Sequence, residues 1–205
     1  NYDYVYDQII ATGELVSSRI LDAVLRFEGL DTCWMDARSM IVTDETWREG
    51  RVQWQETNRQ IAMACSPVLS KDRIIITQGF IASTRENNTV SLGREGSDYT
   101  AAIISAALDA KSMTIWKDVP GVLTGDPKVF DNVTKLERLS FLEAIEMTYY
   151  GAKVIHPKTI QPLKMRNIPL YVKSFLHPSE EGTVIFGEIE REYPPIVVLE
   201  KDQAL

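Results

Sequence analysis

A short run of glycine and charged residues carries the strongest chemical signal in the sequence. Residues 93–98 read Gly-Arg-Glu-Gly-Ser-Asp and lead into a segment, residues 97–110, that predicts a helix. Glycines at positions 93 and 96 permit backbone conformations that side chains would block, and the amides of a helix start favour anions. Arg94 adds a planar guanidinium that suits a carboxylate or a phosphate. The run therefore predicts an anion site, although Ser97 and Asp98 are equally typical of helix capping.

A second set of charged residues follows the next predicted strand, residues 112–116. Lys117 and Asp118 come directly after this strand. A loop rich in glycine and proline continues to residue 131 and contains Leu123 and Lys128. Ligand sites of α/β proteins lie at the carboxyl ends of parallel strands. The Gly and Pro content is explained by a plain loop, but the cluster of charges indicates a binding role.

Two further segments contain candidate side chains with simpler alternative explanations. In residues 149–157, Lys153 fits a solvated loop and His156 fits an extended turn before Pro157. In residues 12–14, Thr-Gly-Glu, an acid at a helix start is favourable through the helix dipole alone. Each of these segments is a weak signal when taken alone.

The segments that must position these side chains alternate between helix and strand patterns. Helices are expected at residues 6–27, beginning near 12–14 because of Gly13, and at 53–65, where Ile61, Met63 and Ala64 should face inward. A β-branched run at 72–81 indicates a strand covered on both faces, and residues 82–91 form a polar segment with a turn at Asn87-Asn88.

A capping box at 140–143 opens a helix to about 150. Another helix is expected at 157–166, and strands at 30–35, 168–173 and 183–186 complete an α/β sandwich with a mostly parallel sheet.

Composition excludes several classes of protein. The chain has 205 residues and a mass of 23.2 kDa, which suits one large domain or two small ones. Its 22 basic and 29 acidic residues give a net charge of −7, which argues against general nucleic-acid binding. Apolar runs fall far short of the ~20 residues of a membrane span. Two cysteines and two histidines leave little material for a zinc site. Cys33 and Cys65 lie far apart and form no CxxC motif, so we expect two buried thiols in a reducing compartment.

Taken together and in order, these segments resemble the amino-acid kinase family, and within it the aspartate kinases. The likeness is carried by residues 12–14, 93–101, 118–122 with 126–127, and 150–157, and it covers about residues 5–187. It implies a three-layer αβα sandwich with a mostly parallel central sheet. It also implies a catalytic domain over residues 1–190, followed at 191–205 by a linker and the first strand of an ACT regulatory domain.

The resemblance implies transfer of the γ-phosphoryl group of ATP to the side-chain carboxylate of L-aspartate. The product is 4-phospho-L-aspartate, the first intermediate toward lysine, threonine and methionine. Because this carboxylate is already ionised at pH 7, the reaction needs no general base, only positioning and neutralisation of phosphate charge. Mg²⁺ is expected on the phosphates without a dedicated protein site. The family also implies a cytoplasmic enzyme without membrane or nucleic-acid partners, and a homodimer formed through the ACT domains.

The roles implied by the resemblance fall into two groups. On the substrate side, Glu14 would bind the α-ammonium, Arg94 would clamp a carboxylate and Ser97 would line the pocket. Asp98 and Lys153 would be catalytic, Asp98 by orienting the cations that hold the transferred phosphoryl group. The nucleotide would be bound by Lys117, Asp118, Leu123, Lys128, Lys153 and Val154.

The sequence departs from the aspartate kinase pattern at several positions. Glu95 stands where glycine is more common, and we expect its side chain to point outward. Lys117, Leu123 and Lys128 replace a common Thr, Tyr and Arg, and Lys128 thereby loses the bidentate fork of arginine. No Lys-Phe-Gly-Gly loop is present, so a fragment incomplete at both ends, with little activity alone, is expected. A kinase for a different amino acid and a non-catalytic ligand-binding module are the alternatives.

Overall fold

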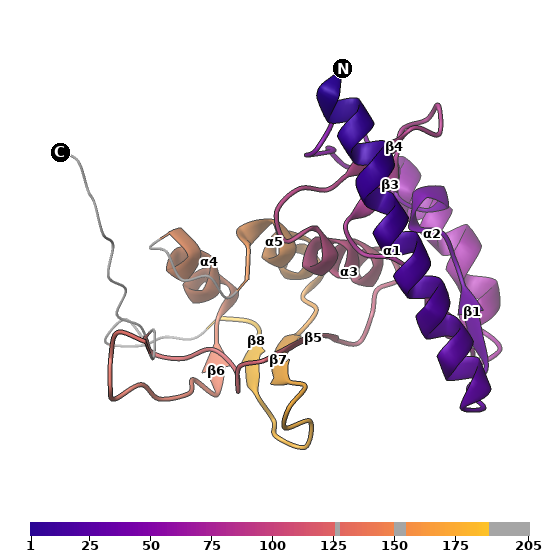
Figure 1. Ribbon diagram of the computed structural model, residues 1–205. Helices are drawn as coiled ribbons and strands as arrows, with labels where there is room; N and C mark the ends of the chain where they lie inside the picture. The colour runs from indigo at the N-terminus through magenta and orange to yellow at the C-terminus, as the bar shows by residue number, and fades with distance from the viewer. Residues whose placement is uncertain (126–127, 150–154, 189–205) are drawn as a thin grey trace. The chain divides into compact units, whose positions relative to one another are not determined.

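The computed structural model describes residues 1–125, 128–149 and 155–188, and it divides the chain into two compact units, residues 1–108 and 109–205 (Figure 1). Helices and strands alternate as expected, so the α/β class is confirmed. Lys153, Val154 and the predicted domain boundary at residue 190 lie outside the described residues. In the part of the chain that the structure describes, no helix is long and apolar enough to cross a membrane.

Helix α1 (Tyr2–Phe27) forms one side of the first unit and is longer than expected. It begins after the cap residue Asn1 and passes through Gly13 without a break, so the predicted start near residues 12–14 is wrong. A Cβ at Gly13 would meet nothing within 4 Å, so this glycine sits on an open face. Its propensity cost of about 1 kcal/mol is small beside the packing of a 26-residue helix. Glu14 is therefore mid-helix, and the dipole of a helix start does not explain it.

The first unit also contains two pairs of short strands. Strands β1 (Thr32–Trp34) and β2 (Ile74–Ile76) pair in parallel, while β3 (Ile81–Ser83) and β4 (Thr89–Ser91) form an antiparallel hairpin. The expected strand 72–81 is thus broken, because the chain turns between β2 and β3 and Phe80 adopts a φ of 72°. Ile74 is 44% exposed, so β2 is not covered on both faces within this unit. The predicted turn at Asn87 is confirmed, with a φ of 62°.

Two helices and one short turn of 3-10 helix complete the first unit. They are α2 (Trp54–Leu69), α3 (Gly96–Ala107) and η1 (Ala37–Ser39). Ile61 of α2 and Ile103 of α3 meet in a buried cluster, but Met63 is 66% exposed and its predicted inward position is wrong. Helix α2 runs past its predicted end at residue 65 and through Pro67 in its last turn, where the helix loses one intrahelical hydrogen bond because proline has no amide N–H.

The second unit is built on a four-stranded mixed sheet. Its strands are β5 (Met113–Lys117), β6 (Arg138–Leu139), β7 (Leu170–Ser174) and β8 (Thr183–Ile185), in the order β5-β7-β8-β6. The β5–β7 and β6–β8 pairs are parallel, and the β7–β8 pair is antiparallel. Over the described residues of both units, three of the five strand pairs are parallel, so the mostly parallel expectation is confirmed.

Local signals predicted the two helices of this unit correctly. Helix α4 (Phe141–Tyr149) opens on the expected capping box, in which the amide of Ser140 donates to Glu143 Oε2 at 2.7 Å. The amide of Glu143 donates back to Ser140 Oγ at 3.1 Å. Helix α5 (Pro157–Arg166) has the predicted bounds, and His156 Nδ1 caps it by accepting from the amide of Lys158 at 3.2 Å. His156 is therefore a structural residue, as its sequence context favours.

Candidate functional site

A pocket of about 500 Å³ in the first unit gathers the three predicted substrate-binding residues. Glu14, Arg94 and Ser97 line it together, although they come from α1, the loop after β4 and the start of α3. The remaining lining residues are Tyr6, Arg48, Phe80, Ser91, Gly93, Glu95 and Gly96. Two guanidinium groups and two carboxylates thus share one pocket.

Helix α1 is anchored to β4 by the side chains of Gln8 and Asp7, and Asp7 lies on the same face of the helix as Glu14. The Gln8 side chain donates from Nε2 to the carbonyl of Thr89 at 2.7 Å and accepts from the amide of Thr89 at 3.1 Å. Asp7 is fully buried, and its Oδ1 accepts from Ser91 Oγ at 2.7 Å. Glu14 lies seven residues, or two helical turns, beyond Asp7, so it projects from the same face into the pocket.

The glycine-rich loop brings Arg94 and Ser97 to the pocket by two left-handed residues. Gly93 has a φ of 77° and Glu95 a φ of 54°, and Glu95 is the cap residue of α3, without a side-chain capping bond. Ser97 and Asp98 therefore lie inside the helix, and neither of them is its N-cap residue. The side chain of Ser97 is not needed as the helix cap, and Ser97 lines the pocket.

Close packing against the turn that precedes β3 holds the start of α3 in place. A Cβ at Gly79 would lie 2.8 Å from the Cα of Ser97, and one at Gly96 would lie 2.8 Å from Phe80 Cδ2. Real Cβ atoms do not approach so closely, so both positions require glycine. Gly96 is thus explained by its packing on Phe80 rather than by close approach of a ligand.

The three predicted residues are available to a ligand. Within residues 1–125, 128–149 and 155–188, the structure records no side-chain hydrogen bond or ion pair for Glu14, Arg94 or Ser97. A guanidinium and a carboxylate, each without a partner and both lining one pocket, suit a ligand that carries both an anionic and a cationic group. An α-amino acid carries these two groups on the same carbon atom.

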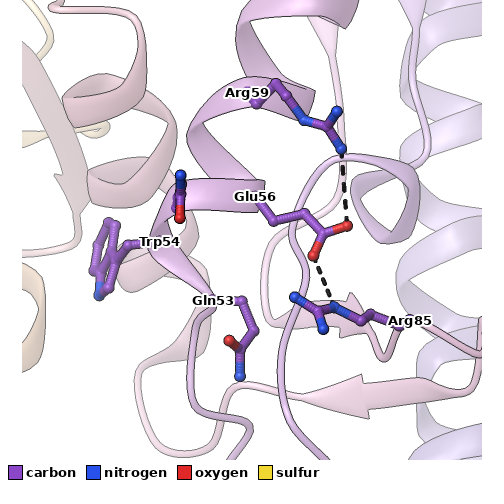
Figure 2. Close-up of a pocket in the computed structure, with 6 residues that line it drawn as sticks. Gln53, Trp54, Glu56, Arg59 and Arg85 are labelled. Atoms are coloured by element: carbon purple, nitrogen blue, oxygen red, sulfur yellow. Dashed lines mark hydrogen bonds and ion pairs between the residues drawn. The ribbon is translucent and has the colours of Figure 1, made fainter.

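A second pocket of the first unit, of about 450 Å³, lacks an unpaired carboxylate (Figure 2). It lies at the start of α2, where Glu56 Oε2 is 2.9 Å from Arg85 Nε and Glu56 Oε1 is 4.0 Å from Arg59 Nη2. Figure 2 shows Glu56 between the two arginines, with Trp54 turned away from them. Both arginines share this one carboxylate, and no other acidic residue among those that the structure describes lines the pocket. It therefore offers no free carboxylate for the ammonium of an amino acid, and it is the weaker candidate for such a ligand.

Glu95 differs from its sequence-based expectation. Its side chain was expected to point outward, but it lines the first pocket, and its Oε2 atom is buried without a hydrogen-bond partner. The left-handed backbone of Glu95 places it there. Tyr6 and Arg48 were also missed by the sequence analysis, because neither belongs to a recognisable motif.

Asp98 lies one residue beyond the pocket lining, in the first turn of α3. A carboxylate there is favourable beside the positive end of the helix dipole. Its predicted role with the phosphoryl group stays a prediction.

The groups of the first unit with shifted pKa values that are described next, Asp36, Tyr99 and Cys65, do not line the pocket. Burial raises the pKa of the Asp36 carboxyl, but hydrogen bonds and the charge of Arg38 outweigh burial, so the pKa lies below its ordinary value. Burial raises the pKa of the Tyr99 phenol. Burial, together with the charge of Cys33, also raises the pKa of the Cys65 thiol. Both cysteines are free, but Cys33 is only partly buried, so the prediction of two buried thiols is wrong for Cys33.

The predicted nucleotide residues lie on the second unit. Lys117 ends β5 and pairs with Ser174 of β7, and Asp118 follows it in an exposed position at the carboxyl end of the strand. Leu123 forms an isolated antiparallel bridge with Lys135, and Lys128 is exposed. Their roles stay predictions, as do those of Lys153 and Val154.

Curated proteins similar in sequence to this chain include aspartokinases. The E. coli (strain K12) lysine-sensitive aspartokinase 3 is 35% identical over 202 residues, which is 97% of this chain and 44% of that protein. The chloroplastic bifunctional aspartokinase/homoserine dehydrogenase 2 of Arabidopsis thaliana is 39% identical over 188 residues, 91% of this chain and 20% of that protein. The chain therefore spans less than half the length of these curated relatives.

Solved structures agree with the sequence relatives. The crystal structure of E. coli aspartokinase III in complex with aspartate and ADP superposes with a TM-score of 0.87 at 35% identity, over 92% of this chain and 42% of that one. A UMP kinase from Ureaplasma parvum, at 18% identity and a TM-score of 0.59, shares the fold alone. Residues 3–174 match the amino acid kinase family as a whole. Because this match spans most of its length, the chain belongs to the amino acid kinase family.

Proposed function

We propose that this chain is part of an aspartate kinase and that the first pocket binds L-aspartate. The observation that carries the proposal is the convergence of Glu14, Arg94 and Ser97, three unengaged side chains from separate parts of the chain, on one pocket. The similarity to aspartokinases, one of them in complex with aspartate and ADP, supports it.

The chemistry needs little from the protein beyond placement and charge. Glu14 accepts hydrogen bonds from the α-ammonium of the substrate, Arg94 binds a carboxylate through two parallel N–H donors, and Ser97 donates its hydroxyl to the bound amino acid. One side-chain carboxylate oxygen attacks the γ-phosphorus of ATP. A bond forms between this oxygen and phosphorus, the bond to the β–γ bridging oxygen breaks, and ADP leaves with those electrons.

The nucleotide and its metal are the less direct part of the proposal. Lys117, Asp118, Leu123, Lys128, Lys153 and Val154 would bind ATP, with Lys153 and Asp98 acting on the transferred phosphoryl group. The residues that the structure describes contain no group of three or more potential metal-binding side chains. We therefore propose that Mg²⁺ is held mainly by the phosphates, where it neutralises charge. Residues 191–205 would lead into an ACT regulatory region, through which a homodimer forms.

Trapping of the acyl phosphate tests this function. The full-length gene product is incubated with ATP, Mg²⁺, L-aspartate and hydroxylamine, which converts 4-phospho-L-aspartate into a coloured hydroxamate. We expect the hydroxamate with L-aspartate, and at least a 100-fold loss of kcat/KM in Arg94→Ala, from the strength of a bidentate charged contact. Unchanged kinetics in Arg94→Ala would contradict the carboxylate role.

The alternatives predict other outcomes of the same assay. Hydroxamate formed only from another amino acid would identify a kinase of different specificity. Binding of L-aspartate and an ATP analogue by calorimetry, without any hydroxamate, would identify a non-catalytic ligand-binding module. The substitutions at Lys117, Leu123 and Lys128 are the features that favour this last outcome.

A further inference from the structure

Arg48 lines the candidate substrate pocket but has no role in the function proposed above. It belongs to a loop, residues 44–51, that the chain fastens at both ends. Asp44 Oδ1 accepts from the amides of Thr46 and Arg51 at 3.1 and 3.0 Å, and the amide of Gly50 donates to the carbonyl of Ser91 at 2.9 Å. Arg48 is therefore presented by an ordered loop.

The backbone of Arg48 is held in an unfavourable conformation. Its φ of 68° lies in the left-handed region, which costs a side-chain-bearing residue about 1–2 kcal/mol. The amide of Arg48 donates to Oδ2 of the fully buried Asp7 at 2.7 Å, while the other oxygen of Asp7 binds Ser91 of β4. Asp7 thus connects α1, β4 and the Arg48 loop at one point.

Neighbouring side chains orient the guanidinium of Arg48 but leave some of its N–H donors available to a ligand. Its guanidinium carbon lies 4.7 Å from the centre of the Tyr6 ring, which also lines the pocket. Its Nη1 lies 3.3 Å from Asp3 Oδ1, in a pair whose side chains are about half exposed. Exposed pairs of this kind contribute about 1 kcal/mol or less, and a guanidinium has five N–H donors. A ligand carboxylate can therefore bind Arg48 beside Asp3 or displace it.

We propose that Arg48 is a second carboxylate-binding residue of the substrate pocket and that Asp7 is its positioning residue. L-aspartate carries two carboxylates and one ammonium. Arg48 and Arg94 supply one guanidinium for each carboxylate, and Glu14 supplies the partner for the ammonium. This inference deepens the proposed function and rests on it, since it explains how the pocket selects a dicarboxylic amino acid.

Amides of aspartate separate the two carboxylates in a binding experiment. The chain is titrated by calorimetry with L-aspartate, with L-asparagine, which lacks the side-chain carboxylate, and with L-isoasparagine, which lacks the α-carboxylate. We expect Arg48→Met to weaken L-aspartate binding about 10- to 100-fold, as for loss of a charge-assisted contact. The same substitution should leave the affinity for one of the two amides unchanged, and Arg94→Met should spare the other.

Two companion variants keep the test independent of folding. Arg48→Gly removes the side chain at a φ that glycine adopts freely, so it should fold at least as stably and bind as weakly as Arg48→Met. Arg51→Met removes a charge from the same loop outside the pocket lining and should bind L-aspartate like the wild type. Equal weakening of all three ligands in Arg48→Met, or wild-type affinity in both Arg48 variants, would overturn the inference.

The role of Asp7 is tested by combining variants. If Asp7 acts through Arg48, Asp7→Asn weakens L-aspartate binding in the wild-type background and has no further effect in Arg48→Gly. Additive losses would contradict the positioning role. Absence of any L-aspartate binding to the wild-type chain would instead contradict the proposed function itself, and the inference with it.

Discussion

Asp7→Asn perturbs the buried point at which α1, β4 and the Arg48 loop meet. The carboxylate accepts two hydrogen bonds of 2.7 Å, one from the amide of Arg48 and one from Ser91 Oγ. Asparagine has almost the same volume but only one accepting oxygen, so one of the two donors would face an NH₂ group. The substitution therefore tests hydrogen bonding with little change in packing.

The expected loss of stability follows from these two contacts. A hydrogen bond to a charged group contributes about 1.5–3 kcal/mol, and a neutral one about 0.5–1.5 kcal/mol. Loss of one charged bond and weakening of the other are partly offset because an amide is less costly to bury than a carboxylate. The net expectation is a destabilisation of about 2 kcal/mol.

Urea unfolding and hydrogen exchange measure this effect together. Trp34, Trp47 and Trp54 all lie in the first unit, so tryptophan fluorescence reports mainly on its unfolding. The backbone amide of Arg48 should exchange faster in Asp7→Asn. Asp3→Asn is the matched control, because it makes the same change on the same helix in an exposed ion pair and should cost less than about 0.5 kcal/mol. Wild-type stability in Asp7→Asn, or unchanged protection of the Arg48 amide, would refute the reasoning.

Four further predictions concern two glycines, the carboxyl of Asp36 and the buried thiol of Cys65. Gly79→Ala should destabilise the first unit by about 1–3 kcal/mol in urea unfolding, because its Cβ would lie 2.8 Å from the Cα of Ser97. Gly13→Ala, at an open helical position, should instead stabilise it by about 1 kcal/mol. Asp36 has a lowered pKa, so its contribution is present above the unfolded pKa and is lost as pH falls through the folded value. The stability advantage of wild type over Asp36→Asn should therefore shrink below about pH 4. Cys65, buried and with a raised pKa, should react with Ellman's reagent only at the rate of unfolding, and fast labelling in the native state would contradict this.

Features determined within a few residues were predicted well. The capping box at Ser140 and Glu143 and the α5 start at Pro157 have all their partners within four positions. Helix α1 was predicted too short because Gly13 was weighed by propensity alone. The buried side chains of Asp7, Ala11 and Ser18 show that packing along α1 outweighs that single glycine.

Only part of the pocket lining was predicted from the sequence. Glu14, Arg94 and Ser97 were identified by type and motif, and the structure brings them together. Arg48 was missed because its anchor, the bond to Asp7, spans 41 positions and leaves no local pattern. Glu95 was assigned outward because extra charges usually face solvent, whereas its left-handed backbone places it in the pocket lining.

The claim that the first pocket is an L-aspartate site is tested most directly by the arginine side chains themselves. The ¹⁵Nε–H signals of arginine are followed by NMR while L-aspartate is added to the chain. The account predicts a saturable shift of the Arg94 signal, while Arg85, which is already paired with Glu56 in the second pocket, stays unchanged. No shift at Arg94 at saturating L-aspartate, or a shift at Arg85 alone, would contradict the account.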